Sequence, residues 1–414
     1  MSLIKNSSYN IAGFVVPTII AIPALGILAR QLGVENFGLF TLAFAIIGYA
    51  SIFDGGISRA VIREIAVFRE DKHEQKRIIS TASVLVIFLG IFSSVVLFFG
   101  SPFLVDFINV SDINSQNAQF SFKLLALIVP FFLINQVWLS FLEGHEEFAN
   151  INIQRVISSV LIFLFPLMFC MHEENLFFAI SGLVLARICS FILTLIICRK
   201  IIFESGLVFD NKVFKRFVKF GGWLTVSNVI SPIMVYFDRF LISNIMGASK
   251  VAFYTAPAEA IARLTNIPSA LSRALFPRLS FTTDTIEKKK LEKISYLIVS
   301  LICLPITIFC YFFSETILTI WLGVEYSGVA ALVFQILLVG FYFNAVAQIP
   351  YSILQARGNS KITALIHIAE IIPYIILLYT LTEEMGVYGT AIAWTLRCTM
   401  DFILMLFFSR KIYF

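Results

Sequence analysis

Charged residues are scarce in this chain. Only 14% of its 414 residues are Asp, Glu, Lys or Arg, while 59% are hydrophobic. Soluble domains carry about 25% charged residues and roughly 45–50% apolar ones, and a water-soluble fold of this length cannot hide the excess apolar surface. The composition therefore excludes an ordinary soluble protein and predicts one whose solvent is lipid.

Sequence motifs for common chemistry are missing as well. There is no Gly-x-x-x-x-Gly-Lys-Ser/Thr loop to hold the phosphates of ATP. The four histidines and six cysteines are scattered without the spacing of metal ligands, and the cysteines lie in apolar runs. No long hydrophilic loop offers room for a catalytic site. We therefore predict no enzymatic activity, no metal and no cofactor, and the net charge of +5 needs no nucleic-acid partner to explain it.

Twelve long apolar runs are present instead. A helix needs about 20 apolar residues to cross a bilayer. The first run is too long for the hydrophobic region of a cleavable signal and ends in Arg30, so we expect it to remain as a span. The expected spans are 9–29, 37–57, 78–100, 120–142, 151–171, 176–198, 217–237, 251–275, 294–313, 328–353, 361–382 and 386–408.

Lysine and arginine concentrate in every second loop between these spans. Of the 31 basic residues, 24 fall on the side that holds both termini, four fall on the opposite side, and three lie within spans. Cytoplasmic loops of membrane proteins carry this excess of Lys and Arg. The distribution predicts that the N-terminus and the C-terminus are both cytoplasmic.

Two segments of the chain repeat at an offset of 214 residues. Residues 33–43, which begin Gly-Val-Glu-Asn-Phe-Gly, resemble residues 247–257, and both follow an odd-numbered span. Each half would begin on the same side of the membrane, so the repeat is parallel and its pseudo-two-fold axis runs along the membrane normal. We predict two six-helix halves, 1–205 and 206–414, with a pathway between them that rocking opens to one side at a time.

Four segments near the ends of expected spans resemble the motifs of the polysaccharide-exporter flippases. They are residues 30–40, 54–60, 238–256 and 355–361. These flippases belong to the multidrug/oligosaccharidyl-lipid/polysaccharide exporter superfamily, and the chain is most similar to its Wzx-type O-antigen flippases. The resemblance implies an all-α, MATE-like integral membrane fold, with about twelve transmembrane helices in two parallel halves around a central cavity.

The same resemblance implies a function. Such flippases move undecaprenyl-diphosphate-linked oligosaccharide, including O-antigen units of lipopolysaccharide, from the cytoplasmic to the periplasmic leaflet of the bacterial inner membrane. The expected partners are this polyprenyl-diphosphate-linked oligosaccharide, membrane lipid, and the polymerase and chain-length machinery of polysaccharide biosynthesis. Two alternatives stay open: a MATE-like exporter of drugs or small molecules, and a membrane-embedded polysaccharide polymerase. The lack of a long periplasmic loop counts against the polymerase.

Six ionisable residues lie deep in the expected spans, where a charge costs about 2.5–3.5 kcal/mol on insertion scales. Four of them form two possible ion pairs, each on one face of its own helix. Glu259 and Arg263 are four residues apart, and so are Arg397 and Asp401. Such pairs could simply lock helix packing. Alternatively, the acids carry a coupling ion, H⁺ or Na⁺, and the arginines face a wet lumen. The acids are Glu259, Glu370 and Asp401, and the arginines are Arg187, Arg263 and Arg397.

Arg187 is the strongest candidate for binding substrate. No acid lies within a turn of it along the helix, and its guanidinium stays charged in a protein. It therefore needs water, a carboxylate from another helix, or an anionic ligand, and its planar fork suits a diphosphate or an acidic sugar. Arg30, Arg59 and Arg273, nearer the membrane edges, are further candidates for substrate contact. For Arg59 and Arg273, anchoring at the membrane surface is the alternative.

Overall fold

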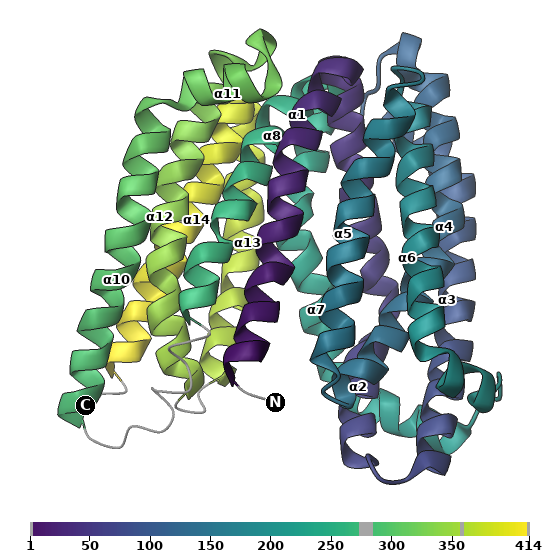
Figure 1. The fold of residues 1–414 in the computed structure, drawn as a ribbon. Coiled ribbons are helices and arrows are strands. Elements are labelled where there is room, and N and C mark those ends of the chain that lie inside the picture. Colours follow the sequence, from purple (N-terminus) through teal and green to yellow (C-terminus); the bar gives the residue numbers. More distant parts are fainter. Residues whose placement is uncertain (1–2, 273–284, 357–359, 412–414) are drawn as a thin grey trace. The chain divides into compact units, whose positions relative to one another are not determined.

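The computed structural model describes residues 3–272, 285–356 and 360–411 (Figure 1). The side chains of residues 3–16, 219–233, 285, 288, 356 and 360 are excluded from this description. Within the described ranges every regular element is helical and none is a strand, which confirms the prediction of an all-α protein.

By packing, the chain forms two compact units, Met1–Phe240 and Leu241–Phe414. The first contains α1 (Leu3–Ala50), η1 (Ser51–Asp54), α2 (Ile57–Val67), α3 (Lys72–Phe107), α4 (Asp112–Gly144), α5 (Phe148–Cys170), α6 (Leu176–Ser205) and most of α7 (Asn211–Met246). The second contains α8 (Ala248–Leu264), α10 (Thr285–Phe312), α11 (Ser314–Leu322), η2 (Val324–Tyr326), α12 (Val329–Ala356), α13 (Ser360–Met385) and α14 (Val387–Lys411). The division of the repeat at residues 205 and 206 remains a prediction.

Nine helices in the described part of the chain are long and apolar enough to cross a membrane. The chain is therefore a multi-pass membrane protein. The count differs from the twelve predicted spans for identifiable reasons. Helix α1 accounts for two of them, α8 is only 17 residues long, and α7 includes residues whose side chains are not described.

The first two predicted spans are joined by a kink within α1 rather than by a loop. The backbone at Gly33 leaves the helical region, with φ 70° and ψ 173°. Glycine reaches positive φ without the steric cost that a Cβ atom would add. The glycine that marks the start of the sequence repeat is therefore the residue at which α1 changes direction.

Small residues let helices of the first unit approach closely. Helix α3 packs on α4, and α5 packs on α6. A Cβ atom placed on Gly182 of α6 would lie 2.6 Å from the backbone of Phe165 on α5, too close for any real contact. Close approach at small residues is a common way for helices to associate in a membrane. Gly182 allows such an approach between α5 and α6.

We expect Gly182→Ala to destabilise the protein. The added methyl group meets backbone atoms, which cannot rotate away, so the α5–α6 contact must widen. Overpacking of this kind costs about 1–3 kcal/mol. Gly100→Ala on α3 is the matched control, because nothing lies within 4 Å of a Cβ atom there. Thermal unfolding of the purified variants in detergent measures the difference, and equal melting temperatures would show that the contact is not tight.

An ionic network joins α2, α3 and the first turns of α7 at one end of the first unit. Arg216 of α7 lies 2.8 Å from the carboxylate of Glu64 and 2.5 Å from that of Glu74, and its guanidinium covers the ring of Phe68 at 5.0 Å. The side chains of Glu64 and Glu74 are only 4% and 10% exposed. Two buried carboxylates therefore share one guanidinium, which we call the Arg216 clamp.

The segment between α6 and α7 is attached to the same place. Arg77 of α3 pairs with Glu74 at 2.6 Å and bonds Asp210, which precedes α7. The hydroxyls of Ser80 and Thr81 accept hydrogen bonds from the backbone N–H groups of Val208 and Asp210. The hydrogen bond from Arg77 lowers the pKa of Asp210. These contacts fix the start of α7 on α3.

Candidate functional site

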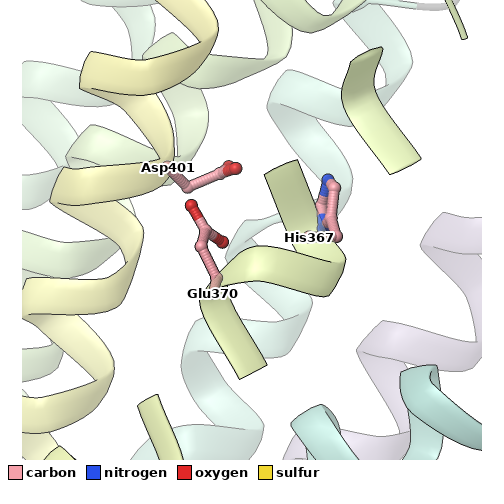
Figure 2. A group of neighbouring side chains, drawn as sticks. All are labelled: His367, Glu370 and Asp401. Carbon is pink, nitrogen blue, oxygen red and sulfur yellow. The ribbon is translucent and has the colours of Figure 1, made fainter. Parts of the chain in front are cut away.

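Three side chains with proton- or cation-binding atoms meet between α13 and α14. His367 and Glu370 lie one turn apart on α13, and Asp401 reaches toward them from α14 (Figure 2). One ligand atom from each residue can be chosen so that all three lie within 4.8 Å of one another. Helices α13 and α14 pack along each other, so the contact depends on the register of two neighbouring helices. We call this group the α13–α14 cluster.

Of the two carboxylates of the cluster, that of Glu370 is buried and that of Asp401 is partly buried. Glu370 is only 5% exposed. Among the described residues, neither of its carboxylate oxygens has a hydrogen-bond partner, and Oδ1 of Asp401 has none either. Burying an ionised carboxylate without a partner is costly, and two of them close together add repulsion. The geometry therefore fits a place where a proton or a cation is held.

Arg397 lies one turn before Asp401 on α14, yet the two do not form the ion pair that their spacing allows. Within the described part of the chain, no Arg397 nitrogen lies within 4 Å of a carboxylate oxygen. Its guanidinium instead lies over the ring of Tyr374 at 5.2 Å and contacts the sulfur of Cys398 at 4.0 Å. Stacking on an aromatic ring thus holds the cation beside the cluster rather than on Asp401.

The other predicted pair is formed. On α8, Nη2 of Arg263 lies 3.7 Å from Oε2 of Glu259, and the side chains are 25% and 22% exposed. Equal spacing along the helix therefore has two outcomes in the second unit. The pair on α8 neutralises itself, as the packing alternative expected. The acid on α14, by contrast, has no paired cation among the residues that the structure describes.

Arg187 occupies a different setting in the first unit. It lies on α6, is partly buried, and holds its guanidinium 5.2 Å from the centre of the Phe132 ring on α4. Its Nε atom has no hydrogen-bond partner among the described residues, and no carboxylate there pairs with it. Of the options open from the sequence, a structural pair with an acid on another helix is thus not observed within the described residues.

The remaining predicted arginines do not join these groups. Arg30 and Arg59 are exposed side chains on α1 and α2. Arg59 follows Asp54, whose carboxylate accepts hydrogen bonds from the backbone and hydroxyl of Ser58 at the start of α2. Arg273 lies outside the described residues. The six arginines predicted to bind substrate are therefore distributed over both units.

An apolar cavity of about 320 Å³ in the first unit contains none of the predicted site residues. It lies between α1, α3 and α4, and its walls include Tyr49, Phe53 and Phe103. Phe103 is 74% exposed. An apolar cavity with exposed phenylalanine at its rim is expected where a membrane helix faces lipid, so this cavity offers no chemistry comparable with that of the cluster.

The model of the family described as "Polysaccharide biosynthesis protein" matches residues 3–283. The chain belongs to this family. It is 48% identical over 405 residues to a Shigella flexneri protein named "Putative O-antigen transporter", covering 98% of this chain and 97% of that protein. The predicted membership of a polysaccharide biosynthesis and export family is thereby confirmed.

Solved structures share the fold. The lipid II flippase MurJ, in an inward closed conformation, superposes with a TM-score of 0.80 at 15% identity, covering 97% of this chain and 87% of that one. An inward-facing multidrug resistance MATE family transporter of the MOP superfamily gives 0.76 at 16% identity, covering 97% and 94%. The MATE-like transporter fold is confirmed, and these relatives are named as transporters and a flippase, not as enzymes.

Sequence reasoning missed one member of the cluster and the whole Arg216 clamp. His367 was visible as a neighbour of Glu370 one turn away, a spacing that places both on one helix face. Its proximity to Asp401 depends on the packing of α13 against α14, which no local pattern reveals. The clamp residues are charged residues of the basic loops, where Arg216 and its neighbours were read only as markers of the cytoplasmic side.

Proposed function

We propose that this protein is a flippase for a lipid-linked oligosaccharide. Its substrate would be an undecaprenyl-diphosphate-linked repeat unit, carried from the cytoplasmic to the periplasmic leaflet of the bacterial inner membrane. The observation that carries the proposal is the 48% identity to the Shigella flexneri protein along 98% of the chain. The shared fold with a lipid flippase supports it. Both termini would be cytoplasmic, and polysaccharide polymerase and chain-length proteins would act on the product.

Alternating access is the proposed mechanism. The diphosphate and sugars would enter a hydrophilic cavity between the halves while the polyprenyl chain stays in lipid. Arg187, whose guanidinium has no carboxylate partner in the described part of the chain, would bind the diphosphate with its two-nitrogen fork. Arg30, Arg59, Arg263, Arg273 and Arg397 would provide further positive charge along the path. Entry of H⁺ or Na⁺ at Glu370 and Asp401 would reset the cycle. Glu259, already paired with Arg263, is the weaker candidate for that role.

Deletion of the gene in its own host tests the flippase proposal. We expect lipid-linked oligosaccharide to accumulate on the cytoplasmic side and surface polysaccharide to be lost, with both restored by the gene on a plasmid. The matched control is a strain that lacks the first glycosyltransferase of the same polysaccharide, which should lose the polymer without accumulating the intermediate. Normal surface polysaccharide in the deletion strain, where no second flippase is encoded, would reject the proposal.

Drug or small-molecule export is the second candidate, because a multidrug MATE transporter shares the fold along 97% of the chain. The deletion strain separates the two functions. If the protein is an exporter, the deletion strain should be more sensitive to toxic organic cations and keep its surface polysaccharide. If it is a flippase, the strain should lose surface polysaccharide and keep its normal sensitivity.

A further inference from the structure

The charge balance of the α13–α14 cluster limits what it can hold. With both acids ionised and His367 neutral, Glu370 and Asp401 carry two negative charges, and Arg397 beside them carries one positive charge. The group therefore has a net charge of minus one. A single added positive charge makes it neutral, and a divalent cation would leave it positive in an apolar membrane, where net charge is costly.

The atoms around the cluster decide between the monovalent candidates. Hard metal cations favour shells built wholly of oxygen atoms. Here one of the three available ligand atoms is an imidazole nitrogen. The guanidinium of Arg397 also lies beside the site, where it stacks on the ring of Tyr374 and keeps its positive charge. A proton needs only one lone pair, and it removes the charge of a carboxylate outright. The mixed nitrogen and oxygen set therefore favours a proton over sodium.

Within the ranges that the structure describes, the other groups around the cluster supply no competing ion pair. On α14, Cys398 contacts Arg397 at 4.0 Å, and the amide of Asn344 on α12 contacts the same sulfur at 4.0 Å. On α13, Tyr374 contributes its ring to Arg397. Helix α8, which also packs against α14, carries Glu259 and Arg263, and these neutralise each other.

We propose that His367, Glu370 and Asp401 form one proton-binding site that holds a single proton in this conformation. The proton bonds to an oxygen of Glu370 or Asp401 and is shared between the two facing carboxylates. His367 passes it to and from the site through its ring nitrogens. That this proton is also the coupling ion of transport rests on the proposed function, whereas proton binding itself does not.

Infrared difference spectroscopy of the purified protein tests the binding step without any transport. We expect the stretching band of a protonated carboxyl group at neutral pH, lost on alkalinisation. Glu370→Gln and Asp401→Asn should each remove the band, and Glu259→Gln should leave it unchanged. Sodium added at constant pH should leave the wild-type band in place. A band that survives in both cluster variants, or one that sodium displaces at constant pH, would overturn the proton site.

Folding and coupling are checked separately. Asp401→Glu keeps the carboxylate and should retain a band at a shifted frequency, which shows that loss in Asp401→Asn is not unfolding. In liposomes, flipping of a polyprenyl-diphosphate sugar should respond to an imposed proton gradient in wild type but not in Glu370→Gln. His367→Gln should shift the pH profile of that response. Flipping that ignores the proton gradient, with the infrared band intact, would overturn coupling while leaving both the site and the flippase function standing.

Discussion

Arg187→Gln will abolish most of the transport activity while the protein still folds. A charged hydrogen bond is worth about 1.5–3 kcal/mol, and each 1.4 kcal/mol is about a factor of ten in binding, so the expected loss is roughly tenfold to a hundredfold. Glutamine keeps the length and polarity of the side chain but removes the charge and the fork. The measurement is surface polysaccharide restored to a deletion strain by each variant, at matched protein levels.

Two further variants show whether the fork or only the charge matters at this position. Arg187→Lys retains a cation but not the two-nitrogen geometry, so we expect partial activity. Arg155→Gln is the control, because Arg155 is an exposed arginine whose side chain is 58% exposed and whose contact with Glu143 is 3.8 Å long. Full complementation by Arg187→Gln would show that Arg187 packs on Phe132 without touching substrate.

The topology of this protein was readable from its sequence because the bilayer imposes it. A spanning helix must satisfy its own backbone and must be apolar for about 20 residues. Most described residues of each predicted span accordingly lie in helices. The junction between the first two predicted spans differs only in form, because a kink at Gly33 within α1 separates the two helical segments where a loop was predicted. Hydropathy gives the positions of polar and apolar residues along the sequence, and it cannot distinguish a short loop from a bend at a glycine.

The ionic groups were predictable only where the partners lie on one helix. The spacing of Glu259 and Arg263 predicted a pair that is present. The same spacing in Arg397 and Asp401 led to a different structure, because Tyr374 on the neighbouring helix offers Arg397 its ring. Contacts between helices depend on register and rotation, which a single sequence does not specify. The cluster on α13 and α14 therefore required the structure.

Arg216→Gln will destabilise the first unit strongly. It removes the cation shared by Glu64 and Glu74. Each poorly hydrated carboxylate then keeps a single arginine partner, Arg63 for Glu64 and Arg77 for Glu74. Loss of one partner of a buried ion pair costs about 3–5 kcal/mol. Arg216 is itself 33% exposed, so water screens part of the loss and we expect a value near the lower end. Unfolding by heat or by a denaturing detergent measures it, again with Arg155→Gln as the exposed control.

A second substitution, Glu64→Gln, distinguishes two causes of the stability lost in Arg216→Gln: excess buried negative charge and lost packing. If the damage comes from the incompletely neutralised carboxylates, Glu64→Gln added to Arg216→Gln should recover much of the lost stability, because an uncharged amide tolerates burial better than an ionised acid. If the damage comes from the guanidinium stacked on Phe68, the double variant will be no more stable than the single one. Recovery would establish that excess negative charge on Glu64 and Glu74 causes the loss of stability in Arg216→Gln. The structural reason is that Arg77 and Asp210 extend the same network to the segment before α7, so neutralising one acid removes the repulsion without releasing that segment.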